Sequence, residues 1–210
     1  LVDDSKKEIV LTGIHTGNYG RDLKLSLADL LEELVKIDGL ERIRISSIEV
    51  TELDEKFMKV LKENNKIVNH MHIPLQSGCD KTLKDMNRKY LTEYFIKKIE
   101  EIRSIRPDIN ITTDVIVGFP GETEEDFETT YKTIEKIKFS KIHVFPYSKR
   151  KGTKAATMPN QVNENIKQQR VHKLLELSER LEKEYMEKYI EEVVEVLPET
   201  IKDNILTGHT

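Results

Sequence analysis

Five short runs of apolar, mostly β-branched residues predict buried strands. The runs are bounded by turn-forming residues and cover positions 8–11, 42–46, 70–75, 111–117 and 141–145. Their first residues lie 28 to 41 positions apart. An eight-unit β/α barrel of about 250 residues uses roughly 31 residues per unit. The spacing therefore predicts consecutive parallel β/α units.

Helical patterns separate these runs. Leucines repeat every three or four positions after Ser26, which forms a capping pattern with Asp29, and Gly39 suits the end of that helix. Further helices are predicted over 53–61, 92–105 and 123–137. A longer helix is predicted over 164–191, packing across the exterior or the mouth of the barrel. Its apolar face is formed by Ile166, Leu174, Leu177, Leu181, Tyr185 and Tyr189.

These elements predict an α/β fold with three parts. Residues 1–160 form a partial, open β/α barrel, residues 161–190 a long connecting helix, and residues 191–210 the start of a small β domain. The polar, basic stretch 148–159 is predicted to be a loop.

Composition narrows the class of protein. The 210 residues carry 34 Lys and Arg against 38 Asp and Glu, a formal net charge of −4, and 37% are hydrophobic. No apolar run approaches the roughly 18 to 20 residues of a membrane span, so no membrane insertion is expected. The acidic balance gives no overall attraction to nucleic acid, so RNA binding would have to rest on local features.

The single cysteine, Cys79, excludes an internal disulfide framework and is too few for a zinc or iron–sulfur site. We expect a cytoplasmic protein. No signal-peptide pattern follows Leu1, and we expect the chain to begin inside a longer protein.

Candidate chemistry is sought at the carboxyl ends of the strands, where parallel β/α folds place their sites. The glycine-rich stretch 12–20 lets backbone amides approach a ligand, although such a stretch is more often an ordinary turn. Ser47 and Glu49 follow the second strand, where they suit either the binding of hydroxyl groups or the capping of a helix.

The third strand leads into the densest polar segment. His70 and His72 share one face of the strand, but they supply only two ligands and no third lies near in sequence. A packed or hydrogen-bonded pair is favoured, and no metal site is predicted. Gln76 can donate to and accept from a polar ligand, whereas Cys79 is interpreted as structural.

Two further charged residues stand out. Arg88 suits either a carboxylate clamp or a surface ion pair. Asp114 is a carboxylate inside an apolar strand, which is costly without a partner and therefore indicates a specific role.

In this order, five segments closely resemble the radical S-adenosylmethionine (SAM) methylthiotransferases that modify tRNA: GIHTGNYG, RISSIE, HMHIPLQSGCDKTLKDMNR, ITTDVIVGFPGETEEDF and HVFPYSKRKGTKAATMP. The first is most similar to the enzymes that act on N6-threonylcarbamoyladenosine beside the anticodon. Enzymes acting on isopentenyladenosine or on a ribosomal protein aspartate are the near alternatives. The final LPETIKDNILTGHT resembles the opening of the RNA-binding TRAM domain.

The resemblance implies a partial barrel of the radical SAM type, with SAM as cofactor and 4Fe-4S clusters in the full-length parent. A Cys-x-x-x-Cys-x-x-Cys loop would hold the SAM-binding cluster. The implied partners are the tRNA anticodon stem-loop and an electron donor such as flavodoxin. The reaction adds a methylthio group to C2 of the adenosine.

The cysteine triad is missing from this chain. We therefore expect a fragment, truncated in its first barrel unit, that carries most of the SAM pocket but is inactive, and no catalytic residue is assigned. Two other classes remain open: a non-catalytic RNA-binding module, and a β/α-barrel enzyme that binds a phosphorylated metabolite.

The resemblance also implies binding residues. Gly13 and His15 would meet the methionine end of SAM, and Ser47 and Glu49 would lie near its ribose and carboxylate. The other implied cofactor residues are Gln76, Arg88 and Asp114, at the sugar and the methionine carboxylate, and Phe145, beside adenine. Lys149, Arg150 and Lys151, with Lys154 nearby, would contact tRNA phosphates, although charges in such a loop are as often simply solvated.

Overall fold

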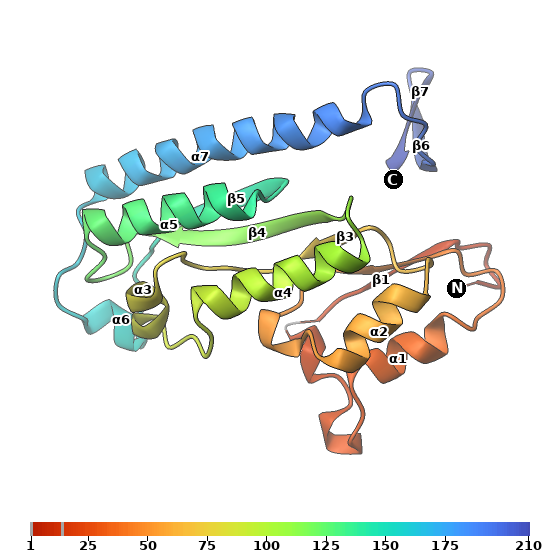
Figure 1. Ribbon diagram of the computed structural model, residues 1–210, viewed down its shortest axis with the longest axis horizontal. Coiled ribbons are helices and arrows are strands. Elements are labelled where there is room, and N and C mark those ends of the chain that lie inside the picture. The colour runs from red at the N-terminus through yellow and green to blue at the C-terminus, as the bar shows by residue number, and fades with distance from the viewer. Residues whose placement is uncertain (1, 14) are drawn as a thin grey trace.

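The computed structural model describes residues 2–13 and 15–210, and its centre is a curved, open sheet of parallel strands (Figure 1). The first pair is β1–β2 and the second group is β3–β4–β5, all parallel. The backbone N–H of Ile48 donates to the carbonyl of His72 at 3.1 Å and links the two groups. The strands are β1 Glu8–Leu11, β2 Arg42–Ile45, β3 His70–His72, β4 Asn110–Val117 and β5 Lys141–Pro146. The predicted α/β fold with an open barrel is confirmed.

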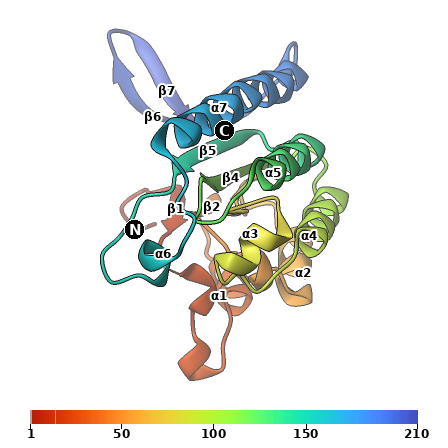
Figure 2. The same cartoon turned by 90° about the vertical axis from the view of Figure 1, so that its left-hand side faces the viewer.

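Helices cover the outside of this sheet, as the view in Figure 2 shows. The α-helices are α1 Leu27–Leu34, α2 Glu55–Glu63, α3 Asp80–Asp85, α4 Thr92–Ile105, α5 Glu124–Ile137, α6 Lys154–Thr157 and α7 Glu164–Met186. Short 3₁₀ turns are η1 Thr16–Asn18, η2 Arg21–Leu23, η3 Val50–Glu52 and η4 Glu187–Tyr189. Capping boxes at Ser26 and Thr123 open α1 and α5. The first confirms the predicted capping pattern of Ser26 with Asp29.

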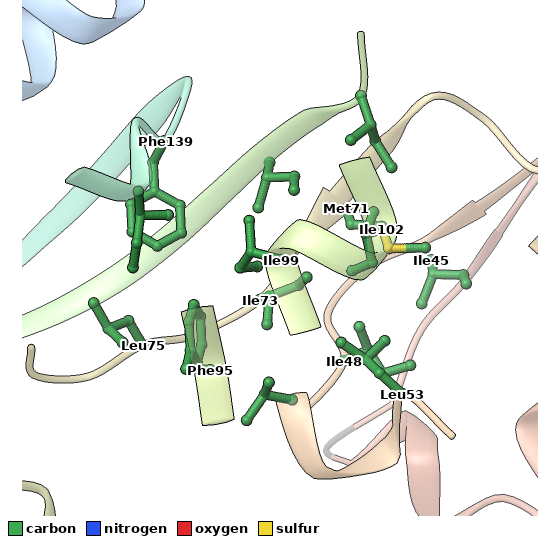
Figure 3. Packing of buried hydrophobic residues seen from close by; sticks show 14 of the residues in the cluster. Ile45, Ile48, Leu53, Met71, Ile73, Leu75, Phe95, Ile99, Ile102 and Phe139 are labelled. Carbon is green, nitrogen blue, oxygen red and sulfur yellow. The ribbon is translucent and has the colours of Figure 1, made fainter. Parts of the chain in front are cut away.

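The main core lies between the sheet and these helices. Phe95 and Ile99 of α4 point toward Ile73, beyond the end of β3, and toward Phe139, which precedes β5 (Figure 3). The Phe95 and Phe139 rings meet edge to face with centroids 6.1 Å apart. All four residues are almost fully buried. This packing holds α4 against the segments that follow β3 and precede β5, and so fixes the helix on one face of the sheet.

That opposite face is polar. Side chains alternate along a strand, so Thr113 and Val115 of β4 lie buried beneath the helices while Thr112 and Asp114 lie on the other face. On the neighbouring strands, His72 is paired with Thr112 and His143 with Asp114. We call this the concave face; it carries the charged and imidazole groups of β3, β4 and β5.

The long helix differs from its predicted pattern in its first turns. Ile166 is 40% exposed, whereas Lys167 and Arg170 are buried. These two charged side chains can be buried because their polar ends are paired. Lys167 donates to the carbonyl of Tyr147 at 3.0 Å, and Arg170 forms an ion pair with Glu122. Farther along, Leu174, Leu177 and Leu181 are buried as predicted. The helix packs on the exterior, against β5 and α5 (Figure 1).

The third strand is shorter than predicted. It ends at His72 instead of residue 75, because Pro74 has no N–H to give to a ladder and Gln76 adopts a left-handed conformation with φ of +66°. The predicted loop 148–159 likewise contains one helical turn, α6.

The last segment forms a β-hairpin. Strands β6 Leu197–Lys202 and β7 Ile205–His209 pair antiparallel and are almost entirely exposed. Arg42 of β2 donates to the carbonyl of His209 at 2.8 Å. The β-structure expected here is confirmed, and its place in a TRAM-like domain stays a prediction. Among the described residues, no helix combines the length and the apolar character that crossing a membrane requires.

Candidate functional site

A network of polar side chains joins the loops that leave β1, β2 and α3. Arg88 donates to Glu49 at 3.0 Å, and both side chains are about 30% exposed. The backbone N–H of Glu49 donates to Glu52 at 3.4 Å, and Glu52 also pairs with His15. Sequence-predicted residues from three separate loops are therefore brought together. Glu49 is the N-cap of the η3 turn, which is the capping role expected of it, and its binding of hydroxyl groups stays a prediction.

Glu52 is the centre of this network, although no motif in the sequence indicated it. Its side chain is 9% exposed and lies 3.9 Å from Arg21 as well. The turn after β1 passes over it so closely that a Cβ on Gly17 would lie 1.6 Å from the Glu52 carboxylate. Within the glycine-rich stretch 12–20, Gly17 thus lets the backbone approach this carboxylate closely. Gly13 lies in the same stretch and is exposed.

Ser47 and Gln76 lie at the ends of neighbouring strands. The Ser47 carbonyl accepts a hydrogen bond from the Thr16 hydroxyl. The Gln76 backbone donates to the carbonyl of Asp114 at 2.8 Å and accepts from Ile116 at 2.9 Å. Within the described part of the chain, the half-buried Gln76 amide has no hydrogen-bond partner. It is therefore a free donor and acceptor at the carboxyl end of the sheet.

Asp114 contacts His72 on the concave face. Its Oδ1 lies 3.3 Å from His72 Nε2, and His72 Nδ1 lies 2.9 Å from the Thr112 hydroxyl. His143 stands opposite Asp114 in the strand register, with its ring centroid 5.7 Å from that of His72. Asp114 thus has the polar partner that a carboxylate in an apolar strand requires, the His72 imidazole, and its functional role stays a prediction.

His70 has a different environment from His72. Burial, together with the charges of Arg44 and His72, lowers the pKa of His70 to about 4. Its Nε2 lies 3.3 Å from the Thr112 hydroxyl, which His72 also contacts. The two histidines thus form the hydrogen-bonded arrangement that the sequence favoured, through a shared threonine.

The remaining predicted residues lie along and beyond β5. Phe145 is half exposed and is paired with Ile116 in the register. Lys149, Arg150 and Lys151 are exposed in the loop that follows the strand. They are not part of the network around Glu52. His143, by contrast, was not predicted as a site residue. The pattern that could have indicated it is a polar residue at an alternate position in an apolar strand.

The resemblance implies two bound groups, SAM and an iron–sulfur cluster, and they require different side chains. The polar parts of SAM can be bound by a free amide, carboxylates and a guanidinium, and its adenine can pack on an exposed aromatic ring. An iron–sulfur cluster is another matter, because Cys79 is the chain's single cysteine, and it is buried with its Sγ 3.4 Å from Asp126. The residues present fit SAM and do not fit a cluster, and the structural interpretation of Cys79 agrees with its burial.

Residues 2–134 match the family model described as the radical SAM superfamily. The chain belongs to the radical SAM superfamily. Two solved radical SAM structures share its fold: coproporphyrinogen III oxidase (HemN) from Escherichia coli, with a TM-score of 0.65 at 15% identity over 83% of this chain and 40% of that one, and the methyltransferase TsrM from Kitasatospora setae, with a TM-score of 0.55 at 14% identity over 69% and 28%. At these identities the likeness concerns the radical SAM fold alone.

Sequence relatives are more similar. The chain is 52% identical to threonylcarbamoyladenosine tRNA methylthiotransferase MtaB of Bacillus subtilis (strain 168), over 100% of this chain and 48% of that protein. It is 42% identical to MtaB of Thermotoga maritima, with the same coverage. It is 43% identical to tRNA-2-methylthio-N(6)-dimethylallyladenosine synthase of Acetivibrio thermocellus, over 97% of this chain and 44% of that protein. This radical SAM chain spans about half the length of these relatives.

Proposed function

We propose that this chain is the SAM-binding part of a tRNA methylthiotransferase that acts on N6-threonylcarbamoyladenosine beside the anticodon. The observation that carries the proposal is the 52% identity to MtaB over the whole chain. The identity to the dimethylallyladenosine synthase of Acetivibrio thermocellus is 43%, so isopentenyladenosine remains the second candidate substrate.

In this proposal the cofactor lies at the carboxyl ends of the strands. SAM supplies the radical-forming and methyl-donating chemistry of the family when it is bound. Arg88 would hold the methionine carboxylate, with Glu49 keeping the guanidinium in place at 3.0 Å. Gln76 would bind the sugar through its free amide, and Phe145 would cover the adenine ring. Gly13 and His15 would line the methionine end, and Ser47 would lie near the ribose and carboxylate.

Two basic surfaces support an RNA substrate. Residues 149–151 are exposed beyond β5. A second surface is an open groove of about 810 Å³ along α3 and α4, whose lining includes Lys84, Lys89, Tyr94 and Lys97. Lysines with an aromatic side chain among them suit phosphates and stacked bases. Arg88 also lines the groove, which connects the proposed RNA surface with the proposed cofactor site.

The proposal also covers the finer partners. The RNA element is the anticodon stem-loop, the reaction takes place in the cytoplasm, and a low-potential electron donor such as flavodoxin serves the full-length enzyme. The exposed hairpin of β6 and β7 would begin a TRAM-like RNA-binding domain after the connecting helix.

A chimera tests the substrate. This chain replaces the matching half of Bacillus subtilis MtaB in a strain without that enzyme, and tRNA nucleosides are analysed by mass spectrometry. We expect methylthiolated threonylcarbamoyladenosine to reappear. A soluble chimera that modifies only dimethylallyladenosine, or neither nucleoside, would contradict the proposed substrate.

A binding experiment tests the cofactor site on the chain itself. SAM affinity is measured by calorimetry for the unchanged chain, for Gln76→Ala and for the matched control Gln168→Ala, an exposed position on α7. We expect about a tenfold loss for Gln76→Ala, the value of one lost hydrogen bond to a polar ligand. The control should bind normally, and equal affinities for both variants would place the cofactor elsewhere.

A further inference from the structure

His72, Asp114 and His143 converge on one point of the concave face. Each comes from a different strand, and one ligand atom from each lies within 4.8 Å of the others. The strand register creates this arrangement, because Asp114 stands opposite His143 and lies two residues from Thr112, which stands opposite His72. Two imidazoles and one carboxylate form a donor set typical of sites for zinc and other divalent transition metals.

One pair of ligand atoms already has the spacing of a metal site. In a tetrahedral zinc site with bonds of about 2.0 to 2.2 Å, neighbouring ligand atoms are about 3.3 to 3.5 Å apart. The distance between His72 Nε2 and Asp114 Oδ1 is 3.3 Å. His143 is exposed on its strand, so its ring has room to turn toward the same point.

The hydrogen bond made by the second ring nitrogen of His72 also matches that of a metal ligand. A metal-binding histidine usually uses its second ring nitrogen in a hydrogen bond that fixes its orientation. His72 Nδ1 lies 2.9 Å from the Thr112 hydroxyl, which leaves Nε2 facing Asp114. The side chains of His72 and Asp114 are 15% and 30% exposed, so the site is shielded yet open to solvent.

We propose that His72, Asp114 and His143 bind a divalent transition metal ion, with zinc as the best fit, through three protein ligands and a fourth, open position. Three ligands with an open position are typical of zinc sites that bind a further small ligand. The proposal does not rest on the proposed function. It gives the Asp114 carboxylate a metal-ligand role in place of the SAM contact implied by the resemblance.

Cobalt(II) is the probe, because it takes zinc-like sites and has a visible spectrum that reports their geometry. The untagged chain is titrated with cobalt(II) and then with zinc(II), which should displace it. We expect one equivalent of cobalt with visible bands of a low-coordinate site, and displacement by about one equivalent of zinc.

Variants locate the site. Asp114→Asn and His143→Gln keep the size of each side chain and should weaken zinc binding at least about 100-fold, whereas Thr112→Val should weaken it about 10- to 100-fold through the outer contact. The control is His172→Gln, which removes an exposed histidine of α7 that lies 3.2 Å from Glu176.

Three outcomes would overturn the proposal. They are an absence of cobalt binding by the folded chain, binding that Asp114→Asn and His143→Gln leave unchanged, and binding lost in His172→Gln. Circular dichroism of each variant shows whether a loss of affinity accompanies a loss of fold. The SAM titrations of Gln76→Ala are independent of these results, so each proposal can fail separately.

Discussion

Individual buried charges in this protein are held by specific partners. Asp126 is one: it closes the capping box of α5 with Thr123 and accepts from Lys81 at 2.7 Å. Burial opposes its ionisation, but the hydrogen bonds from Lys81 and Thr123 prevail and lower its pKa to about 2. Glu122 and Arg170 are the second case, 2.6 Å apart and almost fully buried.

Asp126 should contribute stability that depends on pH. Its pKa is lower in the folded chain than in the unfolded chain, so its contribution is present above about pH 4 and is lost as the pH falls toward 2. We expect Asp126→Asn to lower the free energy of unfolding by about 1 to 2 kcal/mol at pH 6 and by much less near pH 2. Urea unfolding at several pH values measures this difference. The control is Asp85→Asn, a weaker partner of Lys81 at 3.8 Å, which should change stability by under about 0.5 kcal/mol.

Removing Arg170 should be far more damaging. Arg170→Met leaves the buried Glu122 without its cation, and we expect a loss of about 3 to 5 kcal/mol. Burial already raises the pKa of Glu122, so the uncompensated carboxyl should favour its neutral form and the variant should lose stability as the pH rises. Adding Glu122→Gln should recover part of the loss. A double variant that is as unstable as Arg170→Met alone would contradict this account.

At the scale of elements, strand ends decide where side chains go. The β4–α5 turn holds two glycines with positive φ, Gly118 and Gly121. A Cβ on Gly118 would lie 2.4 Å from the Lys167 side chain, whereas one on Gly121 meets nothing within 4 Å. Gly118 therefore has two reasons to lack a side chain, its conformation and the approach of α7, and Gly121 has only the first.

This pair makes a matched test of helix docking. Gly121→Ala should cost about 1 kcal/mol of stability, from the left-handed conformation alone. Gly118→Ala should cost about 2 to 4 kcal/mol, since the buried Lys167 must also shift. Thermal and urea unfolding of both variants measures the difference, and equal losses would mean that α7 adjusts freely.

At the scale of the whole molecule, the hairpin and the sheet differ in how they are held. The core lies between the sheet and its helices, whereas the residues of β6 and β7 are almost all exposed. Hydrogen bonds from Arg42 to the carbonyls of Glu195 and His209 join the two parts. Such contacts add little compared with a buried core.

Ending the chain at residue 190 should therefore leave the rest folded. We expect its free energy of unfolding to fall by at most about 1 kcal/mol, because little apolar surface is uncovered. If the hairpin begins an RNA-binding domain, the same truncation should weaken tRNA binding in a gel-shift assay. Unfolding of the shortened chain would show that the hairpin is part of the main fold.

The helical turn α6 lies in a stretch predicted to be a loop, but the sequence alone predicted the order of the five parallel strands and of helices α1, α2, α4, α5 and α7, together with the Ser26 capping box. Local periodicity and local hydrogen bonds determine these features, and both are visible in neighbouring residues. Ile166 shows where prediction from the sequence fails. Its spacing placed it on the apolar face of the long helix, but Ile166 is exposed in the structure. Arg170 is buried instead, because it pairs with Glu122.

The candidate site required the tertiary structure. His72 and Asp114 were both visible as polar residues in strands, yet 42 positions separate them, and only the parallel register brings them within 3.3 Å and sets His143 opposite. Glu52 became central for a similar reason, since the turn that covers it comes from another strand. Sequence determined which side chains carry the chemistry, and strand pairing, a contact between distant segments, decided which of them meet.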